Sequence, residues 1–450
     1  MKVIVAQKGA REHYAVERAL HQQGMLAGLV TDWYAFGRQT RKQKASTYAK
    51  PRRDGESGNE KTETTKAEKS QRFSISAFQH FGRRGQSALS ARADGIPDEM
   101  VRAFPFRSLL WKWRVRRLSA QKRSHEAYLR TDAAFAAAVA RLKLPPHDVF
   151  IGYSYASLEV LEAEKKRGVL TVLDQIDPGA MEFRLVAEEM ARFPELAGAP
   201  TEFPAAYYER NRREWELADV IVVNSEWSRE AIIAEGANPA KIEILPLAYE
   251  INGEKLKAES RDLQPSTFNP QPSTSPLRVL FLGQVNVRKG IHYLIEAAKL
   301  LANESVRFDV VGSIGILPGA VASAPRKMTF HGPVSRDRVA EWYRQADVFV
   351  LPTLSDGFAL TQLEALAHGL PVIVTPNCGR VAEYGKTGFI TPPRDVQALA
   401  DAIMEFDHNR NLVKEMSPLC IKASEAFSID AYGRRLVEII GNSNLHWNTK

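Results

Sequence analysis

The sequence predicts an α/β protein built from two doubly wound domains that face each other across a cleft. Its 450 residues exceed what a single hydrophobic core usually fills, so two domains are expected. In each half, apolar strands alternate with helical patterns, which is typical of a parallel sheet covered on both faces. Between the halves, residues 259–276 are rich in Pro, Ser and Thr and predict a linker.

The first domain is expected to span residues 1–250. A short apolar strand at residues 2–6 precedes a loop with Gly9 and a helix that runs to about Gly24. An Ala-rich helix is expected at 126–144. Further strands are predicted at 148–154, 169–175, 220–225 and 242–248, separated by helices at 155–168, 205–219 and 226–236.

A basic, partly disordered insertion is predicted within this domain, at about residues 38–123. Residues 41–72 are polar and lack apolar periodicity. Residues 41–123 contain 21 Lys and Arg but only 8 Asp and Glu, a local charge of +13, while the rest of the chain carries −5. Because the basic excess is confined to one stretch, it indicates a local anionic partner and argues against a protein that coats nucleic acid.

The end of this insertion, residues 104–123, combines aromatic and basic residues. Phe106, Leu109, Leu110 and Trp113 recur at helical spacing, and arginines flank them. Cations bind lipid phosphates and indoles favour the headgroup level, so Trp111 and Trp113 beside these arginines suit an anionic membrane surface. The alternative is that the apolar residues pack on the domain and the arginines are only solvated.

The linker is placed at 251–276 and the second domain at 277–425. Its strands are predicted at 278–284, 307–313, 327–333 and 347–353, with helices at 290–302, 335–346 and 395–406. Residues 354–376 supply one more helix and strand. A last helix is expected at 426–450, and packing back on the first domain is one arrangement open to it.

Composition and motifs exclude several protein classes. The two cysteines, Cys378 and Cys420, form no CxxC pattern, which fits a reducing cytoplasm and argues against a disulfide framework or a structural zinc. No apolar run is long enough to cross a bilayer, and the N-terminal run is too short for a signal peptide. HExxH, GxxxxGK[ST] and Ser-His-Asp patterns are absent, so hydrolase and P-loop functions lack support.

The first candidate site is the stretch "LSDGFALTQLEALAHGLPVIVTP", which reads as a loop, a helix and a buried strand. Backbone N–H groups at a helix start attract phosphate, and Gly357 lets a ligand approach the backbone. Asp356 and Glu364 would then accept hydrogen bonds from sugar hydroxyls. The alternative is structural: Thr361 to Glu364 matches a capping box, and Asp356 would be a turn residue.

The second candidate site is "LFLGQVNVRKG", a strand followed by a short loop with Gly283 and a helix start. Arg288 and Lys289 lie at the carboxyl edge of the predicted sheet, where α/β proteins bind ligands. Cations at this edge suit a diphosphate, because they neutralise the charge that grows on a leaving group. A solvated basic loop is the alternative.

Together these motifs resemble retaining glycosyltransferases of family 4, also called group 1, which have the GT-B fold. "DGFALTQLEALAHGLPVI" resembles the family's E-x7-E motif, and "FLGQVNVRKG" resembles its glycine-rich, basic loop. "EYGKTGFITPPRDVQALADAI" and "EWELADVIVVNSEWSREAIIAEGANPAKIEILPLA" resemble further family segments, so the likeness covers about 125–410. It implies two Rossmann-like domains, the first for the acceptor and the second for a nucleotide-sugar donor.

The resemblance also implies roles for single residues. Glu364 matches the acid that holds the donor ribose, and Asp356 matches the acid beside the transferred sugar, although it is one methylene shorter than the usual glutamate. Lys289 matches a lysine on the diphosphate. The backbone of the next positions is expected beside the phosphates: Phe358, Ala359 and Leu360. Gln284 stands where many members have a diphosphate arginine, and Arg288 is the candidate to replace it.

Acceptor-side residues are expected in the first domain. Asp174 and Asp177 are placed just past the carboxyl end of a strand, where one of them would orient the acceptor or the sugar. A turn is the alternative, because "DPG" is a turn sequence by itself. Gly9 is a further acceptor-side candidate, in a loop with one glycine where the family often has several.

The expected function is therefore a retaining, metal-independent hexosyltransferase without a cofactor. It would use a UDP- or GDP-sugar as donor and a glycan, a lipid-linked molecule or a small molecule as acceptor, in polysaccharide or glycolipid biosynthesis of the bacterial type. It would work in the cytoplasm, with residues 104–123 against the inner face of the plasma membrane, and without nucleic acid. A sugar-nucleotide epimerase, a phosphorylase and a non-catalytic sugar-nucleotide-binding protein remain the alternatives.

Overall fold

The computed structural model describes residues 1–9, 14–34, 96–120, 124–198, 202–249 and 275–447. The chain divides into two compact units, Met1–Leu173 and Asp174–Lys450. Most of the predicted insertion at 38–123 lies outside the described residues, as does nearly all of the predicted linker at 251–276.

The first sheet has seven strands in the order β3-β2-β1-β4-β5-β6-β7. Parallel pairing joins β1 to β2 and β4, β2 to β3, and β6 to β7. The strands are β1 (Val3–Gln7), β2 (Leu26–Thr31), β3 (Val101–Ala103), β4 (Val149–Tyr153), β5 (Leu170–Gln175), β6 (Val220–Val223) and β7 (Ile242–Ile244). All residues of β1, β4, β5 and β6 are buried, because helices cover both faces of a parallel sheet.

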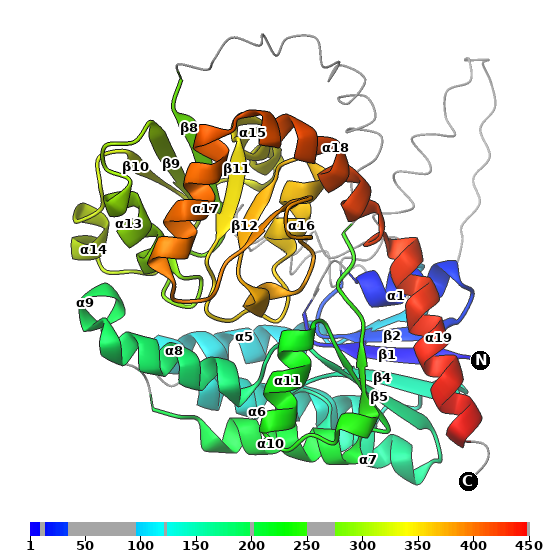
Figure 1. The fold of residues 1–450 in the computed structure, drawn as a ribbon. Helices are drawn as coiled ribbons and strands as arrows, with labels where there is room; N and C mark the ends of the chain where they lie inside the picture. Colours follow the sequence, from blue (N-terminus) through cyan, green and yellow to red (C-terminus); the bar gives the residue numbers. More distant parts are fainter. Residues whose placement is uncertain (10–13, 35–95, 121–123, 199–201, 250–274, 448–450) are drawn as a thin grey trace, which may run out of the picture. The chain divides into compact units, whose positions relative to one another are not determined.

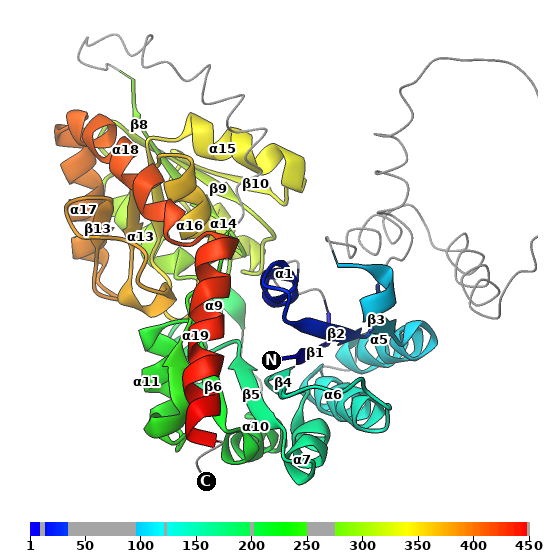
Figure 2. The ribbon, with the colours of Figure 1, turned by 90° about the vertical axis from the view of Figure 1, so that its right-hand side faces the viewer.

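Within Met1–Leu173, helices cover both sides of the strands (Figure 2). Here α1 (Ala15–Gln22) lies on one side of β1 and β2, while α5 (Pro105–Ala120) and α7 (Leu158–Lys166) each pack on α6 (Ser124–Ala140). The next helices in the chain belong to the second unit: α8 (Ala180–Arg192), α9 (Pro194–Ala197), α10 (Ala205–Leu217) and α11 (Glu226–Ala234).

The second sheet has six strands in the order β10-β9-β8-β11-β12-β13, and their pairings are parallel (Figure 1). They are β8 (Leu277–Leu282), β9 (Val306–Val311), β10 (Met328–Gly332), β11 (Val348–Leu351), β12 (Val372–Val374) and β13 (Gly388–Ile390). The helices are α13 (Ile291–Leu300), α14 (Pro318–Ala322), α15 (Val339–Gln345), α16 (Leu360–Ala367), α17 (Val396–His408), α18 (Asn411–Glu425) and α19 (Ile429–Trp447). Short 3-10 turns lie at Asp98–Met100, Pro239–Lys241, Arg336–Arg338 and Pro376–Cys378.

Packing against this sheet holds the start of α13 beside the end of β11. Gly290 has a φ of +69°, and a Cβ there would lie 1.8 Å from the carbonyl oxygen of Pro352. Only glycine tolerates both the backbone conformation and this approach. The residues just before Gly290 are therefore held beside the loop that follows β11.

The predicted alternation of strands and helices is confirmed, and three strands were missed. β2 and β13 each contain a glycine, and β3 has only three residues within the predicted insertion. None of the described helices combines the length and the apolar character that crossing a bilayer requires.

Candidate active site

Two loops at the carboxyl edge of the second sheet are joined through Arg288. Its carbonyl oxygen accepts hydrogen bonds from the Thr353 hydroxyl, at 3.0 Å, and from the Leu354 amide, at 2.9 Å. On the other side, the Asn286 side chain accepts from the backbone N–H of Lys289 at 3.0 Å. The loop after β8 is thus fastened to the loop after β11, and the side chains of Arg288 and Lys289 are held at this edge.

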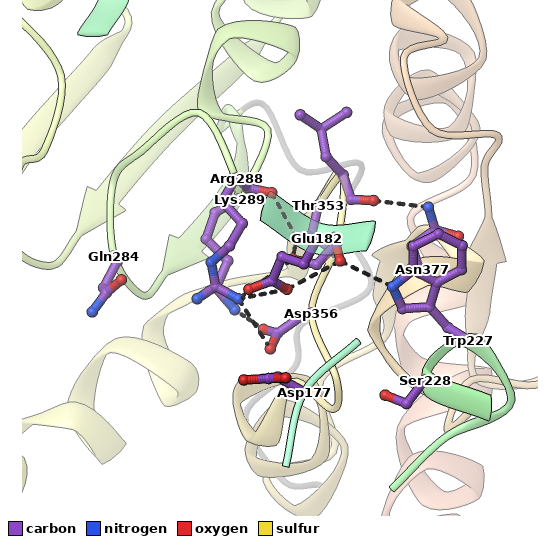
Figure 3. A network of polar contacts seen from close by, with 12 residues as sticks. Asp177, Glu182, Trp227, Ser228, Gln284, Arg288, Lys289, Thr353, Asp356 and Asn377 are labelled. Atoms are coloured by element: carbon purple, nitrogen blue, oxygen red, sulfur yellow. Dashed lines mark hydrogen bonds and ion pairs between the residues drawn. The ribbon is translucent and has the colours of Figure 1, made fainter. Parts of the chain in front are cut away.

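The Asp356 carboxylate pairs with both Lys289 and Arg288 (Figure 3). Lys289 forms an ion pair with one carboxylate oxygen, and a terminal nitrogen of Arg288 lies 3.3 Å from the other. The side chains of Asp356 and Lys289 are only 15% and 11% exposed, so water screens the contact little. The structure therefore brings together the three residues that the sequence analysis placed at the diphosphate and the transferred sugar.

A second carboxylate, Glu182, completes this network and was not predicted. It lies in the first turn of α8, 3.5 Å from a terminal nitrogen of Arg288. It also accepts a hydrogen bond of 3.0 Å from the Ser355 hydroxyl, which itself accepts one of 3.0 Å from the Trp227 indole N–H. Glu182 is 173 positions from Ser355 in the sequence, and no local motif marks it.

Burial changes the acid–base properties of this cluster. It raises the pKa of Glu182, an effect that the Arg288 guanidinium opposes. Burial, assisted by the neighbouring Arg288, lowers the pKa of Lys289 to about 7. The Asp356 carboxylate favours the charged form of Lys289, and a bound diphosphate would do the same. Two cations and two carboxylates stand together here, so an entering anion competes with the carboxylates for the cations.

The predicted phosphate-binding site lies at the start of α16. Gly357 is required there, because a Cβ would lie 2.8 Å from both the Ile176 carbonyl oxygen and the Asn224 side-chain nitrogen. Of the predicted backbone donors, Ala359 is already used, since its N–H donates to the Cys378 carbonyl at 2.9 Å.

The neighbouring amides are better candidates for a phosphate. Within the described part of the chain, no acceptor is paired with the backbone N–H of Gly357, Phe358 or Leu360. The side chain of Phe358 is buried in the core and packs near Phe427, so only its backbone is available.

Glu364 has a separate environment, in the second turn of α16. The predicted capping box is not formed: the helix begins at Leu360 and its N-cap, Ala359, makes no side-chain bond. The Glu364 carboxylate instead accepts a hydrogen bond of 2.9 Å from the Tyr343 hydroxyl. Burial raises the pKa of Glu364, and it raises the pKa of nearby Tyr249 to about 12.

The other predicted donor residues contribute less. Gly283 directly follows β8, and its N–H donates to the Val311 carbonyl at 2.9 Å. Gln284 is exposed, its side chain accepts from Asn286 at 3.2 Å, and it lies apart from the ionic cluster (Figure 3). Arg288, and not Gln284, therefore supplies the second cation of this site.

The predicted acceptor-side residues have different local environments. Asp174 is buried inside β5, which corrects its placement past the end of the strand. Asp177 does follow the strand, and its carboxylate accepts from the Gly179 amide at 2.9 Å, as the turn alternative expected. Gly9 belongs to Met1–Leu173, where its N–H donates to the Asp32 carboxylate at 2.9 Å.

Most of the ionic cluster lies in a segment of the chain that matches a known family. Residues 276–409 match the family described as "Glycosyl transferases group 1". The match covers the second sheet together with Arg288, Lys289, Asp356 and Glu364.

One curated relative is the D-inositol 3-phosphate glycosyltransferase of Paenarthrobacter aurescens, strain TC1. It is 27% identical over 242 residues, which cover 48% of this chain and 57% of that protein. The chain spans between about a third and three fifths of the length of the first curated relatives it matches.

Solved structures show the fold over nearly the whole chain. The Anabaena protein HepE in complex with UDP is 14% identical, with a TM-score of 0.56 over 98% of this chain and 100% of that one. The sucrose-phosphate synthase of Thermosynechococcus elongatus is 17% identical, with a TM-score of 0.54 over 98% and 99%. The predicted fold class is thereby confirmed: a two-domain α/β protein with two parallel sheets, as in GT-B glycosyltransferases.

Proposed function

We propose that this protein is a retaining glycosyltransferase that moves a hexose from a nucleotide-sugar donor to a glycan, a lipid-linked molecule or a small molecule. The pairing of Arg288 and Lys289 with Asp356 carries the proposal, because it places two cations next to a helix start in the segment that matches the family. The E-x7-E spacing of family 4, from Asp356 to Glu364, supports it further.

The donor would bind with its diphosphate on Lys289 and Arg288, which would exchange Asp356 for the phosphate oxygens. The amides of Phe358 and Leu360 would add hydrogen bonds at the helix start, where anions are favoured. Glu364 would hold the ribose and Asp356 a hydroxyl of the sugar. A UDP-sugar is the first candidate, and HepE, solved with UDP, supports it; a GDP-sugar is the second.

Transfer would be a substitution on one face of the sugar ring. The bond from the anomeric carbon to the diphosphate breaks while the acceptor oxygen forms the new bond, and the acceptor proton passes to the departing diphosphate oxygen. Arg288 and Lys289 would stabilise the charge that this oxygen gains. In this mechanism the protein's own cations take the place of a metal ion, and no cofactor takes part.

The acceptor would bind through the N-terminal half, where the predicted candidates to contact it are Asp174, Asp177 and Gly9. Asp174 is buried inside β5, the Asp177 carboxylate accepts from the Gly179 amide, and the Gly9 N–H donates to the Asp32 carboxylate. We place the reaction in the cytoplasm, in the synthesis of a bacterial-type polysaccharide or glycolipid.

A thermal-shift screen against UDP-, GDP-, ADP- and dTDP-sugars tests donor binding. A ligand that binds only the folded state stabilises it by about 2.7 kcal/mol at a hundred times its Kd, so the correct donor raises the melting temperature. The absence of a shift with all four classes would contradict the proposal.

Further measurements on the same protein separate the alternative functions. A binding protein without activity would show the shift but release no nucleoside diphosphate when acceptors are supplied. A phosphorylase would show the absorbance of bound pyridoxal phosphate, and an epimerase would change the donor sugar without an acceptor.

A further inference from the structure

Helix α5 carries large apolar side chains on two opposite faces. On one face, Trp111 is 6% exposed and its ring centroid lies 6.3 Å from Phe104 and 6.0 Å from Phe135 of α6. On the other face, Phe106, Leu110 and Trp113 are 68%, 52% and 55% exposed. The core therefore accounts for Trp111 and leaves the second apolar face unexplained.

Helix geometry shows that the three exposed residues form one stripe. At about 100° per residue, Phe106, Leu110 and Trp113 fall within an arc of about 60°, and Trp111 lies about 140° from Phe106. Exposed apolar residues are ordinary when they are scattered singly, but three neighbours on one helix face indicate an interaction surface.

The charge of α5 identifies the kind of partner. Its 16 residues include no acid and five cations, namely Arg107, Lys112, Arg114, Arg116 and Arg117. On the helix, Arg107 and Arg114 flank the apolar stripe on one side and Arg116 on the other, while Arg117 lies 5.4 Å from the centre of the Trp113 ring. The partner must therefore offer negative charge around an apolar region.

We propose that this face of α5 docks on an anionic lipid surface. Phe106, Leu110 and Trp113 enter the region between headgroups and acyl chains, and the flanking arginines pair with lipid phosphates. Interfacial helices bind in this way, lying in the plane of the bilayer with their apolar side buried. A second copy of the chain is a poorer occupant, because it would bring two sets of five cations together. Nucleic acid would leave the apolar stripe without a partner.

One helix face of this kind gives reversible attachment that depends on salt, because part of it is attraction to charged headgroups. The inference does not rest on the proposed sugar transfer, since it uses only the exposure and charge of α5. Its test accordingly needs no measurement of activity.

The test is co-sedimentation of the full chain with two kinds of vesicle. One is phosphatidylcholine alone, and the other is phosphatidylcholine mixed with phosphatidylserine. The unaltered protein is expected to sediment with the anionic vesicles and to be released by salt. The triple variant Phe106→Gln, Leu110→Gln, Trp113→Gln is expected to reduce the bound fraction at least about tenfold, because it removes the apolar stripe but keeps good helix formers.

Two further variants test whether vesicle binding depends on the arginines and whether it is specific to the apolar stripe of α5. Arg107→Gln, Arg114→Gln, Arg117→Gln is expected to abolish the preference for anionic vesicles. The matched control Leu300→Ser, Tyr384→Ser, Leu419→Ser removes three other exposed apolar side chains, 56%, 70% and 43% exposed, and should bind like the unaltered protein. Circular dichroism of every variant checks that it is folded.

Three results would overturn the proposal. One is failure of the unaltered protein to bind anionic vesicles. Another is undiminished binding by the apolar triple variant, which would reduce the contact to charge alone. The third is a dimer of the unaltered protein, detected by light scattering, that the apolar variant dissociates, because a second copy would then occupy the face.

Discussion

The two acids of the 356–364 segment are separated by seven residues, yet they occupy opposite environments. Asp356 contacts two cations, Lys289 and Arg288, and is held in an ionic network that extends to Glu182. Glu364 contacts a neutral partner, the Tyr343 hydroxyl, and burial raises its pKa.

This difference supports different proposed tasks for the two ends of the segment. An ion pair can exchange one anion for another, so the Asp356 end suits the charged, changing part of a donor. A hydrogen bond from a buried phenol fixes the orientation of a carboxylate, so the Glu364 end suits a part of the ligand that does not react. Removing a cation should therefore affect catalysis most, and altering Glu364 should affect stability in a way that depends on pH.

The largest effect is expected from Lys289→Ala. Loss of this cation removes charge stabilisation at the diphosphate, and kcat/KM for transfer should fall at least about a hundredfold. The melting-temperature shift with the donor should shrink as well. Activity is measured as release of nucleoside diphosphate.

The matched control for this variant is Lys299→Ala in α13, the helix that begins just after Lys289. Lys299 is exposed and pairs only with Glu296 among the described contacts, at 2.8 Å, so transfer should be unchanged. Equal activity of both variants and the unaltered protein would remove Lys289 from the site.

Asp356→Asn is expected to have a smaller effect: the affinity for UDP should rise, and the rate of transfer should fall. The unliganded protein holds Asp356 against both cations, so removing the carboxylate should leave Lys289 without this ion pair and Arg288 with its contact to Glu182, and let UDP bind roughly tenfold more tightly. Transfer should become slower, because the proposed sugar contact is weakened. Titration calorimetry with UDP and a turnover assay measure the two effects.

The control for the ionic exchange is Asp407→Asn, which removes an ion pair with Arg410 outside the network. It should leave UDP affinity unchanged. If Asp356→Asn binds UDP as weakly as the unaltered protein, the carboxylate does not compete with the diphosphate, and the contrast between the two acids loses its basis.

Sequence patterns predicted the elements whose signal is local. β6 and β11 are uninterrupted apolar runs, and the helices between strands have clear periodicity. The pattern failed for β2, where a glycine interrupts the apolar residues, and for β3, which is recognisable only through its pairing with β2. In these strands the tertiary partner, and not the segment itself, decides the structure.

The candidate site likewise contains residues with a local sequence signal and residues that only tertiary contacts reveal. Arg288, Lys289 and Asp356 could be predicted because each lies in a loop that follows a strand, β8 or β11, at the carboxyl edge of the sheet. Glu182 could not, since its contacts to Arg288 and Ser355 join residues far apart in the chain. The capping-box pattern at Thr361 was misleading, because the contact of the Ala359 amide with Cys378 helps to place the helix start one residue before Thr361.

The smallest predicted effect concerns Glu364→Gln and the pH dependence of stability. Burial raises the pKa of Glu364, so the folded state keeps its proton to higher pH than the unfolded chain, whose ordinary value is 4.5. The resulting stabilisation is complete below that value and is lost as the pH rises through the pKa of the folded state. An amide stays neutral and still accepts from Tyr343. The variant should therefore melt about 1–3 °C above the unaltered protein at neutral pH and show little difference at acid pH.

Glu304→Gln, at an exposed carboxylate, is the control, and its difference in melting temperature from the unaltered protein should change much less with pH. If the difference in melting temperature between Glu364→Gln and the unaltered protein stays constant across pH, burial does not raise the pKa of Glu364. The proposed contrast with Asp356, which is paired with two cations, would then fail.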